Sequence, residues 1–306
     1  MSLKRKGVLH TGAPIPLFGL GTWHAQENQV YASVKAALAV GYRHLDCAFI
    51  YLNEDEVGQA IVESGVKRED IFITSKLWNT FHEPQYVEPA LDQSLKYLQL
   101  EYLDLYLMHW PFPMPYVRGD KEGFPQPNGD LLIEIKKSLG ETNPSANLMD
   151  TWRAMEKLVT SGKVKHIGVS NFTIKNLQII LKDCVIRPAV NQVELHPYLP
   201  QHELLAFCKE NNIHVTGYAP LGSFGEPRVL EDPTLKNIAE KNNTDVAHVL
   251  LAWGQQRGCS VIPKSSSEHH IQSNYQDIEL PQEDMKIIDN LPTHKRFFDL
   301  FPVFGD

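Results

Sequence analysis

The chain has 306 residues, of which 42% are hydrophobic and 22% are charged. This composition is typical of a globular protein with a large core. The net charge of −8, the sequence pI of about 5.9 and the lack of any basic run longer than LKRK (3–6) argue against a nucleic-acid-binding protein.

The cysteines and the apolar segments indicate where the protein works. The four cysteines lie far apart and form no CxxC pair, which argues against a disulfide scaffold or a structural zinc site. The N-terminus has no apolar signal core, and no apolar run approaches the roughly 18 residues that cross a membrane. We therefore expect a cytoplasmic protein without a bound metal.

Short segments rich in β-forming residues alternate with longer amphipathic segments along the chain. The predicted strands cover residues 16–21, 43–46, 71–77, 103–109, 164–170, 189–194, 214–220 and 259–265. The predicted helices cover residues 30–40, 54–64, 86–98, 148–161, 173–182, 201–211, 234–256 and 268–275. We expect the segment 234–256 to form two helices that are separated at Asn242-Asn243.

Eight strands separated by helices predict parallel pairing, and eight strands close a (β/α)8 TIM barrel. The competing α/β fold is an open doubly wound sheet, which usually carries GxGxxG directly after its first strand. The segment FGLGTW (18–23) has only GxG, so the sequence favours the barrel. Residues 7–16 predict a β-hairpin with a Thr-Gly turn that covers the bottom of the barrel.

We expect one barrel domain over residues 1–306. Two segments are too long for ordinary connections, namely about 110–147, which is rich in Pro, Gly and charge, and the tail at about 292–306. Long segments without regular structure are usually binding loops or lids, so we expect both on the substrate side of the barrel.

Four ionisable side chains follow the predicted strand ends: Asp46, Tyr51, Lys76 and His109. The active site of such a barrel lies at the carboxyl ends of its strands. A tyrosine, whose pKa is ordinarily about 10, is a poor acid near neutral pH unless its phenolate is stabilised. A nearby lysine ammonium lowers that pKa, and an aspartate keeps the ammonium charged and oriented. The set predicts a proton relay for a carbonyl oxygen that gains hydride.

Several segments resemble the aldo-keto reductase family: GYRHLDCAFIYLNEDEVGQAI (41–61), ITSKLW (73–78), LDLYLMHWP (103–111), GVSNF (168–172) and VIPKS (261–265). They occur in the family's order and spacing, and the resemblance is greatest to fungal aldose, aldehyde and glycerol-type reductases. The resemblance implies a barrel that binds NADPH in an extended conformation. It also implies a catalytic tetrad in which Tyr51 protonates the carbonyl oxygen, Lys76 and Asp46 tune Tyr51, and His109 orients the substrate.

The resemblance also implies a binding site for the cofactor. Ser170, Asn171 and Gln192 match the side chains that hold the nicotinamide carboxamide, and Tyr218 matches the ring that stacks on the nicotinamide. The segment APLGS (219–223) matches the loop that covers the pyrophosphate. The full set of implied cofactor-binding residues is Gly21, Thr22, Trp23, Asp46, Ser170, Asn171, Gln192, Tyr218, Pro220, Leu221, Ser223, Lys264, Ser265, His270 and Asn274.

Two positions depart from the family pattern near Lys264, which matches the site of the adenosine 2′-phosphate. The family commonly has an arginine where this chain has His270, and a glutamate where it has Ser273. A histidine is charged only in part near neutral pH, so it should hold a phosphate less firmly than an arginine. We therefore expect a preference for NADPH with NADH tolerated. The alternative is that His269 and His270 form a solvated pair that faces away from the cofactor.

By the same resemblance, an aromatic pocket binds the substrate. The implied substrate-binding residues are Trp23, Tyr51, Trp78, His109, Trp110 and Phe298, with Phe112, Phe297 and Phe301 as further candidates. The tail aromatics could instead form a hydrophobic latch. Xylose reductases of this group have an aspartate and an asparagine where this chain has Ile50 and Phe298. We therefore expect aldehydes with few hydroxyl groups, aromatic ones included, before aldoses or ketones.

Other functions remain open at this point. The chain could oxidise glycerol or another polyol with NADP, or it could be a non-catalytic regulator that binds nicotinamide. A metal-dependent hydrolase is poorly supported, because no HxH pair follows a strand and no HExxH occurs. The strand-end charges could also be ordinary structural ion pairs. We expect a small-molecule carbonyl substrate and either a monomer or a homodimer.

Overall fold

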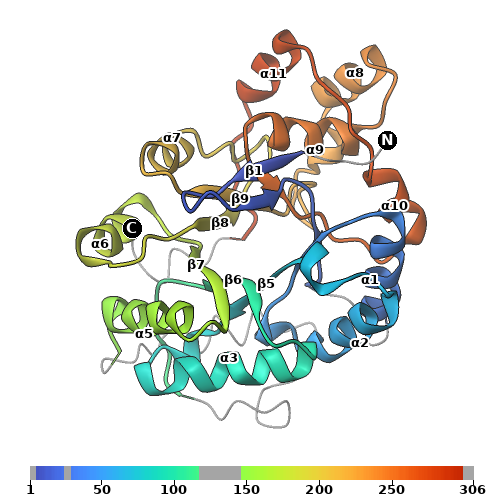
Figure 1. Cartoon of the computed structure of the whole chain (residues 1–306). Coiled ribbons are helices and arrows are strands. Elements are labelled where there is room, and N and C mark those ends of the chain that lie inside the picture. Colours follow the sequence, from blue (N-terminus) through green and yellow to red (C-terminus); the bar gives the residue numbers. More distant parts are fainter. Residues whose placement is uncertain (1–4, 24–28, 117–145, 299–306) are drawn as a thin grey trace.

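The computed structural model describes residues 5–23, 29–116 and 146–298. Here, eight parallel strands form one sheet in chain order and helices surround it (Figure 1). The strands are β3 (Leu20–Gly21), β4 (His44–Asp46), β5 (Phe72–Leu77), β6 (Leu103–Met108), β7 (Val164–Ser170), β8 (Val190–Glu194), β9 (His214–Tyr218) and β10 (Ser260–Val261). The helices are α1 (Gln29–Val40), α2 (Glu54–Ser64), α3 (Pro84–Leu98), α5 (Leu148–Thr160), α6 (Ile174–Asp183), α7 (His202–Glu210), α8 (Pro233–Lys241), α9 (Val246–Gln256), α10 (Glu268–Asn274) and α11 (Gln282–Asp289).

Backbone hydrogen bonds between the first and last strand regions close the sheet into a barrel. The N–H of Gly19 donates to the carbonyl of Val261 at 2.9 Å, and the N–H of Gly21 donates to the carbonyl of Pro263 at 3.0 Å. A Cβ atom on Gly21 would lie 2.9 Å from the carbonyl oxygen of Ile262, so this close approach requires a glycine. The predicted (β/α)8 barrel is confirmed.

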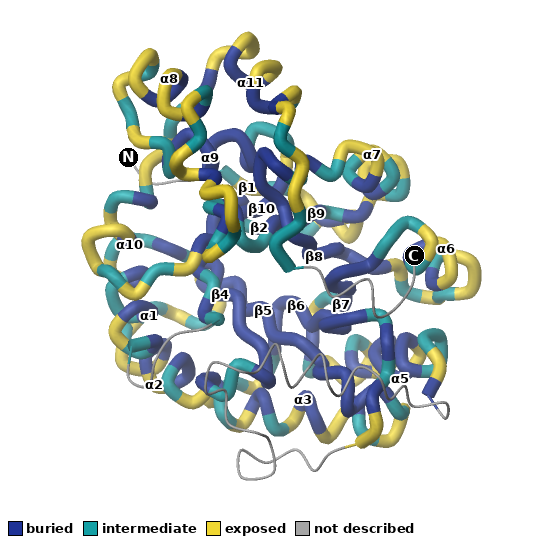
Figure 2. The backbone as a smooth tube through the Cα atoms, turned by 180° about the vertical axis from the view of Figure 1, so that it is seen from behind, coloured by how far each residue is buried: buried dark blue, intermediate teal, exposed yellow. Residues whose placement is uncertain are grey.

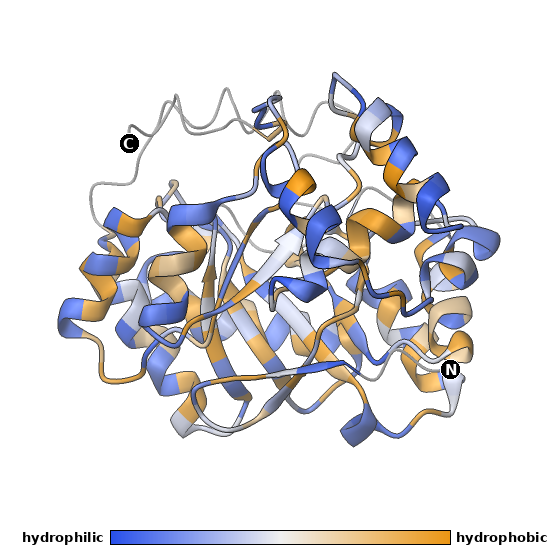
Figure 3. Cartoon of the chain, turned by 90° about the horizontal axis from the view of Figure 1, so that it is seen from above, coloured by the Kyte–Doolittle hydropathy of each residue, from blue (hydrophilic) through white to orange (hydrophobic). Residues whose placement is uncertain are grey.

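The burial pattern explains why the strands lie inside the ring of helices. Every residue of β5 and β6 is buried, as expected for a parallel sheet that is covered on both faces. In α5, the buried side chains of Trp152, Met155 and Leu158 recur every three residues and form one apolar stripe. Figure 2 shows the buried strands at the centre, and Figure 3 shows hydrophobic and hydrophilic segments alternating along the peripheral helices.

The predicted N-terminal hairpin is confirmed. β1 (Lys6–Val8) pairs with β2 (Pro14–Pro16) in antiparallel fashion, and Gly12 adopts φ +84° in the turn between them. In Figure 1 the hairpin, in dark blue, lies in front of the barrel strands. Leu9 and Ile15 bury their side chains among those of Phe72, Leu105, Leu107, Ala189 and Val190. The hairpin therefore fills the end of the barrel opposite the carboxyl ends of its strands.

Some element boundaries differ from the sequence prediction. The first and last barrel strands are much shorter than expected, since β3 and β10 contain two residues each. Pro16 belongs to β2 instead, and Pro263, which lies in the missing part of the last strand, has no N–H for a sheet hydrogen bond. The break between α8 and α9 at Asn242-Asn243 is confirmed, whereas α11 was not predicted.

Parts of the sequence prediction fall outside the described residues. These are most of the long loop expected at 110–147 and the tail beyond residue 298. The assignment of residues 1–306 to one domain therefore stays a prediction. Within the described residues, no helix is both long and apolar enough to span a membrane.

The four cysteines are free thiols, and three of them are fully buried. Burial raises the pKa of Cys47 well above its ordinary value, and it raises the pKa values of Cys208 and Cys259 to about 12. Cys184 is partly exposed, and its pKa is also raised, mainly by burial. Few thiolates therefore form near neutral pH.

The hairpin should contribute strongly to stability through Ile15, whose side chain is completely buried. We expect Ile15→Ala to lower the free energy of unfolding by about 2–5 kcal/mol, because the substitution leaves a cavity. Denaturant titration measures this effect. Val8→Ala in the same hairpin is the control, since Val8 is 70% exposed and its truncation should change stability by less than about 0.5 kcal/mol. Equal losses of unfolding free energy in the two variants would contradict the role of the hairpin in filling the end of the barrel.

Candidate active site

A cavity of about 420 Å³ lies at the carboxyl ends of the barrel strands. Nearly all of the residues that the sequence singles out for the site border it. They are Gly21, Thr22, Trp23, Asp46, Tyr51, Trp78, His109, Trp110, Ser170, Asn171, Gln192, Tyr218, Pro220, Leu221, Ser223, Lys264, Ser265, His270 and Phe298.

Four of the named residues do not border the cavity, and one of them, Phe297, stacks on His196 instead. Lys76 is completely buried but reaches wall residues through its ammonium group. Asn274 is buried in α10, and Phe112 is buried against the Trp110 ring. Phe301 lies outside the described residues.

Sequence reasoning did not assign several wall residues a binding role. They are Ile50, Phe224, Leu230, Ile262, Pro263, Ser266 and Ser267. Phe224 and Ser266 directly follow the predicted segments 219–223 and 261–265, so extending those segments by one residue would have included them. Ala219 also borders the cavity, as its place in the predicted segment 219–223 implies. No sequence pattern points to Leu230, because it lies in a 3₁₀ turn (Val229–Glu231) well beyond the predicted segment 219–223.

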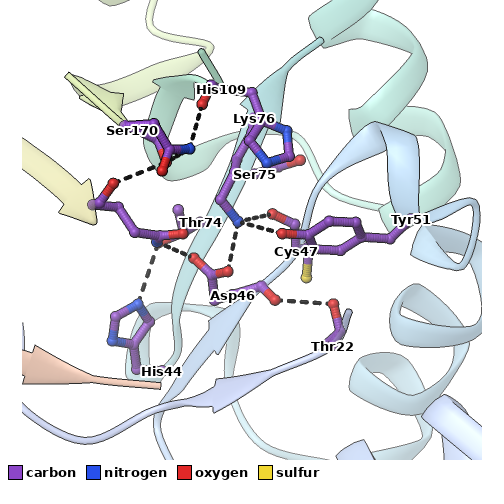
Figure 4. Close-up of polar contacts among 12 residues, drawn as sticks. Thr22, His44, Asp46, Cys47, Tyr51, Thr74, Ser75, Lys76, His109 and Ser170 are labelled. Atoms are coloured by element: carbon purple, nitrogen blue, oxygen red, sulfur yellow. Dashed lines mark hydrogen bonds and ion pairs between the residues drawn. The ribbon is translucent and has the colours of Figure 1, made fainter. Parts of the chain in front are cut away.

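The Lys76 ammonium joins three acceptors at the floor of the cavity (Figure 4). Its Nζ lies 2.5 Å from Oδ1 of Asp46, 2.8 Å from the carbonyl oxygen of Cys47 and 3.3 Å from the hydroxyl of Tyr51. An ammonium has three N–H donors, so each of them has an acceptor. The side chain of Lys76 is therefore fixed in both position and charge.

The backbone after β4 brings Tyr51 back towards the strand end from which it departs. Ala48 is extended, and residues Phe49–Tyr51 then form a 3₁₀ turn in which the N–H of Tyr51 donates to the carbonyl of Ala48. Leu52 ends this turn in the left-handed region at φ 55°. Because the chain reverses so tightly, Tyr51 contacts the same Lys76 ammonium as Asp46, five residues earlier.

The protonation states follow from burial and from the ion pair. Burial raises the pKa of Tyr51 to about 12, and the Lys76 ammonium opposes this rise without cancelling it. Burial also disfavours the charged form of Lys76, but Asp46 and Tyr51 outweigh it, so the pKa of Lys76 is raised. Lys76 therefore lowers the pKa of Tyr51 as the sequence predicts, but burial has the larger effect, so the net pKa is raised and not lowered. Near neutral pH, Tyr51 carries its proton and Lys76 is charged.

His109 faces the tyrosine across the cavity. Its ring lies edge-on to Tyr51 and Trp78, with centroid separations of 5.8 Å and 5.3 Å. Burial, with a smaller contribution from the charge of Lys76, holds the pKa of His109 well below its ordinary value. The imidazole is therefore neutral near pH 7 and can donate one N–H.

Asn171 lies at the end of β7 in the left-handed region, with φ 63°. Asparagine tolerates this conformation better than most residues. Its Nδ2 donates to the carbonyl of His109 at 3.0 Å, and its Oδ1 accepts from the Tyr218 hydroxyl at 2.9 Å. This second bond fixes the ring of Tyr218 along the cavity wall.

Gln192 connects the neighbouring strand to the ion pair. Its Nε2 donates to Oδ2 of Asp46 at 2.6 Å, while its backbone carbonyl accepts from the Ser170 hydroxyl at 2.9 Å. The amide oxygen of Gln192 has no hydrogen-bond partner in the described part of the chain. An acceptor on the cavity wall is thus available to an amide N–H of a ligand.

Two basic side chains lie at another part of the cavity wall. Lys264 and His270 are both exposed and both border the cavity. The alternative that His269 and His270 together face away from the cavity is wrong for His270. Ser273 points elsewhere, because its hydroxyl lies 3.2 Å from Nε2 of His248.

The sequence of this chain is similar to those of known proteins along most of its length. The profile of the aldo/keto reductase family matches residues 17–292. The bovine (Bos taurus) protein "Aldo-keto reductase family 1 member A1" is 47% identical over 304 residues, which cover 95% of this chain and 90% of that protein. "Glycerol 2-dehydrogenase (NADP(+))" of Saccharomyces cerevisiae is 47% identical over 295 residues, with 94% and 90% covered.

A solved structure, the aldose reductase from Schistosoma japonicum, superposes with a TM-score of 0.84 at 40% sequence identity. The match covers 98% of this chain and 95% of that one. Sequence and structure agree along almost the whole length, and the chain belongs to the aldo/keto reductase family.

Proposed function

We propose that the protein reduces aldehydes to alcohols with NADPH as the cofactor and Tyr51 as the proton donor. The observation that carries the proposal is the buried Lys76 ammonium, which lies 3.3 Å from the Tyr51 hydroxyl beneath an aromatic cavity. The similarity to an aldo-keto reductase and to an NADP(+)-dependent glycerol dehydrogenase supports it.

Tyr51 donates its proton only when the carbonyl oxygen of the substrate gains negative charge. With a pKa of about 12, its hydroxyl stays protonated near neutral pH. A carbonyl oxygen that becomes an alkoxide is more basic than a phenolate, so the proton moves to it. The phenolate that remains is stabilised by Lys76, and Asp46 keeps that ammonium in place. General acid catalysis of this kind contributes about 10²–10⁴ in rate.

His109 positions the carbonyl group. Because its imidazole is neutral, it donates an N–H without competing as an acid. A carbonyl oxygen that accepts from both His109 and Tyr51 is held between two donors from different strand ends. Its carbon then faces the part of the cavity that Tyr218 borders.

The wall residues fit a nicotinamide dinucleotide. NADPH, when bound, supplies the hydride to the carbonyl carbon. The amide oxygen of Gln192 accepts from the carboxamide, and the Tyr218 ring offers a stacking face. Lys264 would provide positive charge for the 2′-phosphate, and the His270 imidazole would donate an N–H to it. NADH, which lacks this phosphate, is a tolerated second cofactor.

The wall above the tetrad selects the substrate. Trp23, Trp110 and Phe298 are aromatic and Ile50 is apolar, so the hydroxyl groups of a bound sugar would find few partners there. Burying a hydroxyl without a partner costs about 1–3 kcal/mol. We therefore propose aldehydes with few hydroxyl groups, aromatic ones among them, as the preferred class.

The other functions are less well supported. Oxidation of a polyol is the same reaction in reverse, and the net direction depends on reactant concentrations. A non-catalytic regulator has no need for Lys76, whose burial is costly, beside a protonated Tyr51. The described residues contain no group of three side chains that could hold a metal ion, so the structure offers nothing in favour of the hydrolase.

We also propose a cytoplasmic location and either a monomer or a homodimer.

Replacing the proton donor tests the function directly. We expect Tyr51→Phe to lower kcat for aldehyde reduction by about 10²–10⁴, because the general acid is lost. Fluorescence titration should show nearly unchanged NADPH binding. Tyr106→Phe is the control, because this buried hydroxyl has no hydrogen-bond partner in the described residues and does not border the cavity. A Tyr51→Phe enzyme with normal turnover would refute the proposal.

The cofactor preference should depend on His270. We expect His270→Arg to increase the preference for NADPH over NADH by about tenfold, because arginine carries a permanent charge. His270→Ala should weaken NADPH binding and leave NADH binding nearly unchanged, because NADH lacks the 2′-phosphate. Dissociation constants of both cofactors test both statements, with His269→Arg as the control. Equal NADPH dissociation constants in wild type and in His270→Ala would remove the role of His270.

The apolar wall predicts an order of substrates. We expect kcat/KM for benzaldehyde to exceed that for xylose by about tenfold or more, because buried sugar hydroxyls would lack partners. A panel of aldehydes, ketoses and polyols, assayed with both cofactors, measures this order. Efficient turnover of xylose together with poor turnover of benzaldehyde would contradict it.

A further inference from the structure

Glu194, the last residue of β8, has a carboxylate that the proton relay does not use. The side chain is completely buried, and Nε2 of His196 lies 2.8 Å from its Oε1. Its Oε1 accepts from the backbone N–H of Phe297 at 2.7 Å, and its Oε2 accepts from the N–H of Phe298 at 3.0 Å. A buried carboxylate is therefore balanced mainly by two N–H groups that lie more than a hundred residues away in the chain.

Phe298, which Glu194 fixes, is part of the cavity wall. Its ring lies edge-on to Trp23 with a centroid separation of 5.5 Å, and edge-on to Tyr218 at 5.6 Å. It thus lies between a residue of the substrate pocket and the ring proposed to stack on the nicotinamide. A shift of the backbone at residue 298 would change the shape of both regions.

Phe297 extends the same anchor to the loop on the other side of the cavity. Its ring stacks on His196 with a centroid separation of 4.7 Å, and it also packs against Gly222 and Gly225. A Cβ atom on Gly225 would lie 2.2 Å from this ring, so the glycine leaves the space that Phe297 fills. Of the residues from 219 to 224, all except Gly222 border the cavity. One carboxylate therefore holds a wall residue and, through Phe297, the loop that flanks it.

We propose that Glu194 is a positioning residue for substrate selection, which it exerts by clamping the backbone of Phe297 and Phe298 over the cavity. This inference rests on the proposed reductase function. Large aldehydes that reach the Phe298 ring should depend on the clamp. Short aliphatic aldehydes, which reach only the tetrad, should not. NADPH should also bind less tightly when the loop loses Phe297 as a support.

The chain offers a matched control in Glu156 of α5, another buried carboxylate that accepts two backbone N–H groups. In Glu156, the N–H groups of Val185 and Ile186 both donate to Oε1, at 2.7 Å and 2.8 Å. A glutamine at position 156 keeps that single oxygen and can satisfy both donors. In Glu194 the two N–H groups use different oxygens, so a glutamine must leave at least one of them without an acceptor. Glu156 does not border the cavity.

The experiment compares the wild-type enzyme, Glu194→Gln and Glu156→Gln. With benzaldehyde, Glu194→Gln should raise KM by about fivefold or more while kcat changes less than about twofold. With propanal, neither constant should change by more than about twofold. The dissociation constant of NADPH should rise by about threefold or more in Glu194→Gln alone. A purely structural role would not separate the two aldehydes.

Hydrogen exchange provides a readout that needs no catalysis. The amides of Phe297 and Phe298 should exchange about tenfold faster or more in Glu194→Gln than in wild type, with no such change in Glu156→Gln. If Glu194→Gln matches Glu156→Gln in both exchange and kinetics, the clamp is refuted. If the wild-type enzyme reduces neither aldehyde, the proposed function fails, while the exchange rates still decide whether Glu194 holds the tail.

Discussion

The ammonium of Lys76 has no exposed surface, so its charge depends entirely on partners within the barrel. Removing an ion from water costs several kcal/mol, and removing one partner of a buried pair typically destabilises a protein by about 3–5 kcal/mol. Asp46, the Cys47 carbonyl and Tyr51 meet this requirement together. The ends of β4 and β5 and the turn that carries the tyrosine are therefore held in one arrangement. The buried Lys76 ammonium is costly for folding, but its need for partners also fixes the geometry of the site.

The closed barrel decides which side chains can join this pair. Parallel register places Asp46 beside Thr74 and Ser170 beside Gln192, so alternate residues point into the barrel at matching heights. The hairpin fills the opposite end with apolar side chains, which leaves the carboxyl ends of the strands as the place for a polar cavity. The apolar side chains thus fill the hairpin end of the barrel, and the polar groups lie at the carboxyl ends of rigid strands.

Local patterns predicted the barrel well, because helix periodicity and the hairpin turn are encoded within short segments. That Asp46, Tyr51 and Lys76 lie together was also predictable, since strand ends of a barrel converge whatever their distance in sequence. The pKa of Tyr51 was not, because a sequence shows the neighbouring lysine but not how completely the phenol is buried. The contact between Glu194 and Phe297 was hidden for a similar reason: its acceptor is a carboxylate, but its donors are backbone groups that any residue would supply.

The burial of the thiols has a consequence for an enzyme that handles electrophiles. Aldehydes, and unsaturated ones above all, modify proteins by reacting with thiolates, which are far more nucleophilic than thiols. Cys47 directly follows Asp46, and the barrel keeps its thiol both covered and protonated. Cys208 and Cys259 are protected in the same way. An architecture that keeps its thiols buried and protonated protects its own sulfurs from modification by reactive aldehydes.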